Sequence, residues 1–155
     1  MIESSEIPQI RWVPPVYFLM WLVAGFALNS LLPTITLAGP PATAAGILLA
    51  VTALGINQWS VRAFKAAQTP LYVRRPAAVM VTAGPYQYTR NPLYLSMALC
   101  MVAFALVADQ LWLLLTAPLF FMVFNQRVII PEERYLEMRF GHEYIVYKQA
   151  VARWV

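Results

Sequence analysis

The chain has 155 residues, of which 61% are hydrophobic and only 12% are charged, and its formal net charge is +4. A soluble domain is roughly half apolar and about a quarter charged, so this composition argues against an ordinary soluble domain. We expect an integral membrane protein with a single domain over residues 1–155.

Four apolar runs predict the spanning helices. The first covers residues 13–32, the second 42–61, and the last two fill 93–130, interrupted only by Asp109 and Gln110. Because about 20 apolar residues cross the hydrocarbon core, we expect an all-α fold with about four transmembrane helices. The third run is short for a full crossing, which leaves a re-entrant hairpin as the alternative for the last two runs. The first run is longer than the core of a signal peptide, so we expect it to be retained.

The basic residues predict the orientation. With four spans, the two loops around Gly39 and Asp109 carry no Lys or Arg, and the other side carries all eleven. They are Arg11, Arg62, Lys65, Arg74, Arg75, Arg90, Arg127, Arg134, Arg139, Lys148 and Arg153. The positive-inside rule then places both termini and the 62–92 loop in the cytoplasm. Since topology accounts for the positive charge, we expect the lipid bilayer as a partner and no nucleic acid.

The loop before the third run ends in a sharp turn at residues 84–91, which we call the corner. Residues 79–82 are apolar and partly β-branched, which favours extended backbone over helix, and Gly84 then turns the chain. Pro92 is expected to open the third helix with Asn91 as its N-cap, because proline suits the first helical position. The positive end of that helix would face the cytoplasm.

The C-terminal tail predicts a pair of short cytoplasmic helices. Residues 131–133 are expected to open the first, since acidic residues favour a helix N-terminus, and Gly141 to end it. In the second, Tyr144, Tyr147 and Val151 recur at i, i+3 and i+7, which indicates an amphipathic helix. Its simplest interpretation is a helix on the membrane interface, anchored by Arg153 and Trp154.

Two polar clusters flank the last two runs. One comprises Tyr86, Tyr88, Arg90, Asn91 and Tyr94, and the other Glu132, Glu133, Tyr144 and Tyr147. If the last two runs form an antiparallel hairpin, both clusters emerge at the same cytoplasmic face and can line one pocket. Each member also has an ordinary alternative, because tyrosines anchor helices at interfaces and acidic residues favour helix starts.

The side chains of these clusters suit a ligand with mixed charges. Tyr rings attract cations, carboxylates accept hydrogen bonds from hydroxyls and amines, and Arg90 can pair with a ligand carboxylate. S-adenosyl-L-methionine combines a sulfonium, an amine, a carboxylate and a ribose, so it is the cofactor that we expect. We predict no metal site.

Two stretches of the sequence, VTAGPYQYTRNPLY and PEERYLEMRFGHEYIVYKQAVARW, resemble the isoprenylcysteine carboxyl methyltransferase family and the related phospholipid N-methyltransferases. The shared pattern is a Gly-x-Tyr turn, an Arg-Asn/His-Pro-x-Tyr helix start, an acidic pair, and Phe-Gly followed by Tyr-x-x-Tyr-Lys. The resemblance covers roughly residues 69–154 and implies a membrane methyltransferase. It assigns the cofactor to Ala78, Val79, Met80, Val81, Tyr86, Asn91, Pro92, Leu93, Tyr94 and Glu132.

The methyl acceptor is left open. The eukaryotic prenylcysteine enzymes carry His at the position of Asn91 and Arg at that of Val128, where this chain has Arg127 alongside. Methyl transfer mainly needs alignment, so a carboxylate acceptor requires only a cation, for which Arg90 is the candidate. An amine acceptor must lose a proton, for which Glu133 is the candidate.

We therefore expect methyl transfer to a lipophilic, membrane-associated acceptor, with a carboxyl group of the isoprenylcysteine type as the first choice. A phospholipid or another small amphiphile is the second. A non-catalytic membrane module, whose tail helices bind a partner or anionic lipid, is the alternative from another class.

Overall fold

The computed structural model of the chain describes residues 13–33, 35–37, 39–71 and 77–154, and no strand occurs in these ranges. The elements in order are α1 (Pro14–Leu31), α2 (Pro40–Ala66), the 3₁₀ turn η1 (Gly84–Gln87), α3 (Pro92–Val107), α4 (Leu111–Phe124), the π-helical η2 (Asn125–Ile129), α5 (Ile130–Phe140) and α6 (His142–Ala150). The all-helical expectation is confirmed.

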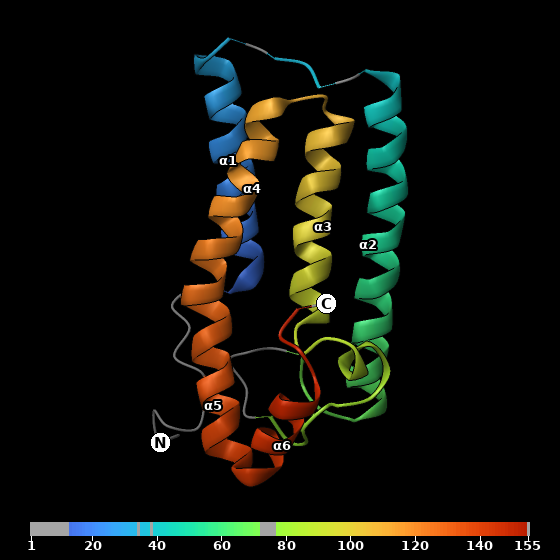
Figure 1. Cartoon of the computed structure of the whole chain (residues 1–155), viewed down its shortest axis with the longest axis vertical. Coiled ribbons are helices and arrows are strands. Elements are labelled where there is room, and N and C mark those ends of the chain that lie inside the picture. Colours follow the sequence, from blue (N-terminus) through green and yellow to red (C-terminus); the bar gives the residue numbers. More distant parts are fainter. Residues whose placement is uncertain (1–12, 34, 38, 72–76, 155) are drawn as a thin grey trace.

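The helices α1, α2, α3 and α4 run along the long axis of the molecule (Figure 1). In that view α3 lies between α2 and α4, and α1 packs against α4. Together α4, η2 and α5 make one helix whose lower part extends beyond α1–α3, and α6 and η1 lie at the same end (Figure 1). The pocket described below is built at this end.

Small residues let the helices approach closely. A Cβ atom added at Gly46 in α2 would lie 2.9 Å from the Ala103 carbonyl oxygen of α3, so glycine is needed for this contact. The main apolar cluster lies between α3 and the α4–α5 helix and contains Met101, Ala117, Phe120, Phe124, Val128 and Ile129. Tight packing around this cluster fixes the start of α3 relative to α5.

Three helices are long and apolar enough to cross a membrane: Pro14–Leu31, Pro40–Ala66 and Leu111–Phe140. The fourth apolar helix, α3, has 16 residues and falls short of the others. At a rise of ~1.5 Å per residue it is ~24 Å long, less than the ~30 Å of a typical hydrocarbon core. Four full spans are therefore not confirmed.

The prediction that a separate tail helix begins at Pro131 is wrong, because α4 continues through η2 into α5. Proline inside a helix lacks an N–H and crowds the preceding turn. Here that turn widens, and the Ile130 N–H donates to the Asn125 carbonyl five residues back. Glu132 and Glu133 thus lie inside a continuous helix, and a favourable helix start does not account for them.

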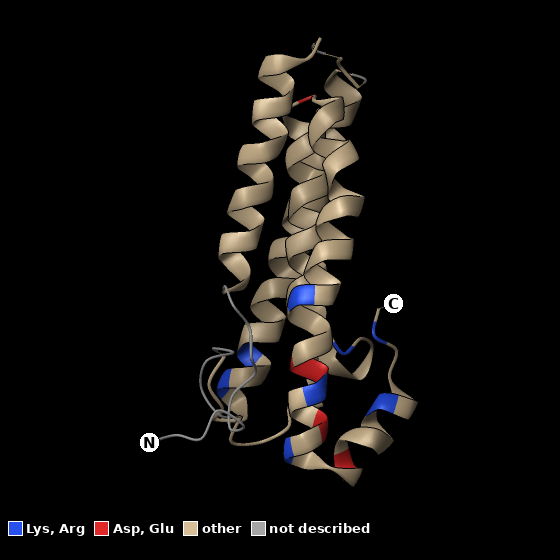
Figure 2. Ribbon diagram, turned by 90° about the vertical axis from the view of Figure 1, so that its left-hand side faces the viewer, with Lys and Arg blue, Asp and Glu red and all other residues tan. Residues whose placement is uncertain are grey.

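The ribbon segments of the described Lys and Arg residues all lie in the half of the molecule that holds η2, α5 and α6 (Figure 2). The other end holds the α1–α2 and α3–α4 loops, and Asp109 joins them by accepting the backbone N–H of Leu37 at 2.8 Å and of Gly39 at 3.3 Å. Three basic residues counted from the sequence, Arg11, Arg74 and Arg75, lie outside the described residues. The charge separation agrees with the predicted topology, whose direction across the membrane stays a prediction.

Candidate active site

A pocket opens at the charged end, between the end of α2, the 77–86 segment, the start of α3, and α5 with α6. Among the residues that line it are Val79, Met80, Val81, Tyr86, Arg90, Asn91, Leu93, Tyr94, Glu132 and Glu133, all of them sequence candidates. Two candidates do not line it: the Ala78 N–H donates to the Thr69 hydroxyl at 3.1 Å, and Pro92 is buried at the start of α3. The structure thus brings both polar clusters to one place, except for Tyr88, which is exposed and packs against Trp59.

The corner before α3 forms one wall of the pocket. Gly84 has φ +65° and lies so close to the Trp59 indole that a Cβ atom would be 3.1 Å from its Nε1, so both conformation and space favour glycine. Tyr86 is buried and packs edge-on against Phe64. Burial raises the pKa of the Tyr86 phenol, which therefore stays protonated. The segment 79–82 before it is neither helix nor strand.

Asn91 is the N-cap residue of α3 by position, but its side chain makes no cap hydrogen bond. Its Nδ2 instead donates to the Arg153 carbonyl at 3.3 Å, so the expectation of side-chain capping is wrong. The C-terminal segment occupies the amide that would otherwise turn to the helix start. Pro92 opens the helix as predicted.

Tyr94 and Glu132 join α3 to α5 inside the pocket. The Tyr94 hydroxyl donates to Glu132 Oε2 at 2.5 Å, across 38 positions of sequence. The Tyr94 ring packs on Phe124 with ring centroids 5.0 Å apart, which holds the hydroxyl in place. Tyr94 is the one hydrogen-bond partner of the Glu132 side chain among the described residues, so this carboxylate is available to a hydroxyl or cationic group of a ligand.

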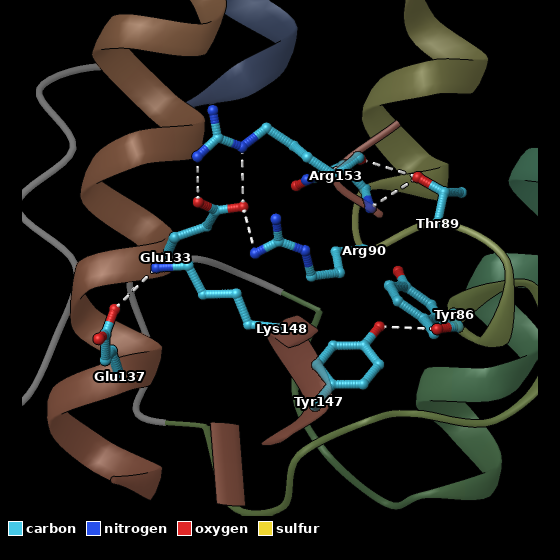
Figure 3. Close-up of polar contacts among 9 residues, drawn as sticks. Tyr86, Thr89, Arg90, Glu133, Glu137, Tyr147, Lys148 and Arg153 are labelled. Atoms are coloured by element: carbon cyan, nitrogen blue, oxygen red, sulfur yellow. Dashed lines mark hydrogen bonds and ion pairs between the residues drawn. The ribbon is translucent and has the colours of Figure 1, made fainter. Parts of the chain in front are cut away.

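Glu133 is bound by two guanidinium groups (Figure 3). Arg153 binds it in bidentate fashion, with Nε 3.0 Å from Oε1 and Nη2 2.6 Å from Oε2. Arg90 contacts it once, with Nη1 2.9 Å from Oε1, and the side chains of Arg90 and Glu133 are only 9% and 7% exposed. The Glu133 hydrogen bonds raise the pKa of Arg153, which stays charged.

Two nitrogen atoms of the Arg90 guanidinium group, Nε and Nη1, have no hydrogen-bond partner among the described residues. The Nη1 contact with Glu133 is close, yet the N–H bonds do not point at the carboxylate with hydrogen-bonding geometry. A buried guanidinium with unpartnered N–H groups in a pocket wall is suited to an anionic group of a ligand.

The C-terminal segment after α6 was not recognised from the sequence as part of the site. The Ala152 carbonyl accepts the Arg90 N–H at 2.9 Å, and the Arg153 carbonyl accepts the Thr89 hydroxyl at 2.9 Å. Trp154 packs against Phe121 of α4. Arg153 and Trp154 therefore connect the corner to the α4–α5 helix, where the sequence suggested interfacial anchors.

Two residues of α5 that bind the pocket segment at residue 77 also went unrecognised. The Tyr135 hydroxyl accepts the Ala77 N–H at 3.0 Å, and Arg139 Nε donates to the Ala77 carbonyl at 2.7 Å, so α5 holds the segment that begins at residue 77. Their i, i+4 spacing on α5 was the signal that could have identified them.

Two tyrosines of α6 complete the wall. Tyr147 donates to the Tyr86 carbonyl at 2.7 Å. Tyr144 is almost fully buried, and this burial, reinforced by Glu133 and opposed by Arg90, raises its pKa to about 12. Burial also raises the pKa of Tyr147, so both phenols are neutral at ordinary pH.

The eukaryotic prenylcysteine enzymes have an arginine at the position of Val128, but in this chain neither Val128 nor its neighbour Arg127 supplies a cation to the pocket. Val128 is fully buried in the apolar cluster, and Arg127 beside it is exposed and does not line the pocket.

Comparisons with known proteins cover most of this region. A family model described as phospholipid methyltransferase matches residues 41–143, from the start of α2 to the start of α6. An uncharacterized protein of Haemophilus influenzae is 43% identical over 63 residues, which is 41% of this chain and the full length of that protein. No solved structure matches the chain. The matched region includes the pocket segments at 79–94 and 132–133, and it ends before Tyr144 and Arg153.

Proposed function

The chain belongs to the phospholipid methyltransferase family, and from this premise we propose that it transfers a methyl group from S-adenosyl-L-methionine to a lipid acceptor in the pocket at its charged end. The observation that carries the proposal is the convergence of Tyr86, Arg90, Tyr94 and Glu132 on one pocket from segments far apart in sequence. Family membership implies a membrane methyltransferase, and the pocket supplies a place for the cofactor.

The donors and acceptors of the pocket fit this cofactor. Glu132 and the Tyr94 hydroxyl suit an ammonium or ribose hydroxyl, and the unpartnered N–H groups of Arg90 suit a carboxylate. Met80, Val81 and Leu93 supply an apolar wall for a flat ring. When bound, S-adenosyl-L-methionine supplies a methyl group on a sulfonium that is already activated, so the task of the chain is alignment.

A phospholipid amine is the acceptor that family membership favours. An amine must lose a proton, and we keep Glu133 as the candidate that accepts it. Because both Glu133 oxygens contact guanidinium groups, one of these contacts must loosen before the carboxylate takes a proton. Whether the Arg90–Glu133 contact must loosen during the reaction therefore depends on whether the acceptor is an amine.

A carboxyl acceptor of the isoprenylcysteine type is the second candidate. The unpartnered N–H groups of Arg90 favour it, because a guanidinium holds a carboxylate without any base. In this case Glu133 keeps its contacts throughout.

We further propose that all four apolar helices cross the bilayer as a single domain of residues 1–155, with both termini and the pocket on the cytoplasmic side. The described Lys and Arg residues at one end support this orientation (Figure 2). The short α3 is accommodated by a small tilt or by local thinning of the bilayer. Cofactor then enters from the cytoplasm and the acceptor from the membrane.

The test uses the purified chain in nanodiscs. We expect calorimetry to detect S-adenosyl-L-methionine, and radiolabelled methyl groups to appear on phosphatidylethanolamine in the same discs. Label on a farnesylcysteine analogue, with none on the phospholipid, would select the second candidate. No binding at about 1 mM cofactor, the upper end of ordinary KM values, would contradict the proposed function and favour a non-catalytic membrane module.

A further inference from the structure

The balance of charge around Glu133 is uneven. One buried carboxylate faces two guanidinium groups, and the contacts join it to Arg90 at 2.9 Å and to Arg153 at 2.6 Å. Glu133 and its two direct partners therefore carry a net charge of +1, and of the two arginines Arg90 is buried whereas Arg153 is one-third exposed. A surplus buried cation is costly unless another group shares it.

The surplus falls on Arg90. Arg153 uses two N–H groups on the two Glu133 oxygens, in the fork geometry that best fits a carboxylate. Arg90 approaches the oxygen that already receives Arg153 Nε, and its own Nε and Nη1 have no hydrogen-bond partner in the described part of the chain. Arg153 thus forms the better-oriented contact with Glu133, and Arg90 Nε and Nη1 are left without a hydrogen-bond partner among the described residues.

The backbone keeps the two arginines in this arrangement. The Ala152 carbonyl accepts the Arg90 N–H at 2.9 Å. The next carbonyl, that of Arg153, accepts from Thr89 at 2.9 Å and from Asn91 at 3.3 Å. The segment that carries Arg153 is therefore fastened to the residues on both sides of Arg90.

We propose that Arg153 is a positioning residue that neutralises Glu133 and so leaves Arg90 to bind an anionic group of a ligand, a carboxylate or a phosphate. The identity of the ligand rests on the proposed function. The anion is either the carboxylate of the cofactor or the phosphate of a lipid headgroup, and Arg153 touches neither.

Removing Arg153 has a consequence that a merely structural role does not share. In Arg153→Gln, Arg90 is the remaining cation on Glu133 among the described residues, and an anionic ligand must compete with a buried carboxylate for it. If Glu133 is also replaced by Gln, this competitor disappears and Arg90 is available again. The second substitution should therefore restore what the first removes.

The experiment compares wild type, Arg153→Gln, and the double variant Arg153→Gln with Glu133→Gln, each full length in nanodiscs. Calorimetry measures binding of S-adenosylhomocysteine, which carries the carboxylate, and of 5′-methylthioadenosine, which lacks it. Glycerophosphoethanolamine, a soluble phosphate-bearing headgroup, is the third probe. Because a charge-assisted contact is at stake, we expect about a tenfold or larger loss for the anionic probe in Arg153→Gln and recovery to within about threefold in the double variant.

Two controls separate charge and folding from positioning. Lys148→Gln removes one cation from a half-exposed ion pair with Glu137 at the same end and should leave all three affinities unchanged. Arg153→Lys keeps a cation beside Glu133 and should retain most of the anionic binding. Thermal melting of each variant identifies losses that come from unfolding.

The outcomes distinguish the claims. The loss and recovery with S-adenosylhomocysteine alone identifies the cofactor carboxylate, and the same pattern with glycerophosphoethanolamine alone identifies the headgroup phosphate; either supports the inference. Equal losses for S-adenosylhomocysteine and 5′-methylthioadenosine, or no recovery in a double variant that melts like Arg153→Gln, would overturn it. If the wild-type chain binds none of the three probes, the result contradicts the proposed function and therefore also the inference that rests on it.

Discussion

The two ends of the molecule both join segments that are far apart in sequence, but they do so by different means. At the loop end, Asp109 accepts two backbone N–H groups, and the Leu111 N–H donates to the Ile35 carbonyl at 3.2 Å. At the charged end, backbone contacts such as that of the Arg90 N–H with the Ala152 carbonyl are joined by contacts between side chains, among them Tyr94–Glu132 and the arginine pair on Glu133. Nε and Nη1 of Arg90 have no hydrogen-bond partner among the described residues. A polar cluster with spare donors can bind a ligand, so this difference supports the proposed placement of the site at the charged end.

The largest expected effect concerns the sides of the membrane on which the two ends lie. In a Cys100→Ser background, Thr36→Cys and Thr82→Cys place single thiols in the two regions at exposed positions. An impermeant maleimide added to sealed vesicles should label only one of the two, since the proposed topology separates them. Labelling of both from the same side would show that the helices between them do not separate the ends.

Glu132→Gln should distinguish the ends by ligand binding. Loss of a charge-assisted hydrogen bond costs roughly 1.5–3 kcal/mol, so cofactor affinity should fall about ten- to a hundredfold in calorimetry. Asp109→Asn is the matched change at the other end and should leave cofactor affinity within about twofold of wild type. Equal effects of the two variants would remove the distinction between the ends.

The bundle that connects the ends depends on the close contact of α2 with α3. Gly46→Ala places a Cβ atom 2.9 Å from a backbone carbonyl, so we expect it to lower the free energy of unfolding by about 1–3 kcal/mol in denaturant melts. Gly55→Ala in the same helix has nothing within 4 Å and should raise stability by about 0.5–1 kcal/mol through helix propensity. A destabilised Gly55→Ala variant would argue that this face of α2 is packed against something else.

A similarly small effect, opposite in sign to that of Gly55→Ala, is expected at the loop end. Asp109→Ala removes the acceptor of two backbone N–H groups and should lower the free energy of unfolding by about 1 kcal/mol, because the group is partly accessible to solvent. Methyl transfer should continue in the folded variant. A loss of activity without a change in melting would mean that this end also serves the reaction.

Local sequence features were predictable because they depend on neighbouring residues. The apolar runs indicated the helices, Pro92 opened α3 and Gly141 ended α5, each through constraints on its own backbone. The continuity of α4 and α5 was missed because a π-turn accommodates Pro131, and no propensity reports such a turn. The residue set of the pocket could be anticipated largely through the family resemblance.

The contacts within the site were not predictable in the same way. Asn91 reaches a carbonyl 62 positions away, and Arg153 pairs with a carboxylate 20 positions away. Such contacts arise only when α6 turns back under the corner, which is a property of the tertiary fold. Spacing in the sequence indicated which residues carry chemistry, whereas the packing decides which of them meet.

Photolabelling with radiolabelled S-adenosyl-L-methionine tests the central claim most directly. The wild-type chain in nanodiscs is irradiated with the cofactor, digested, and the labelled peptides are identified by mass spectrometry. We predict label in residues 77–94 or 132–147, reduced by excess S-adenosylhomocysteine, because these segments line the pocket. Specific label confined to the loop end, at residues 33–39 or 109–112, or no competable label at all, would contradict the placement of the site.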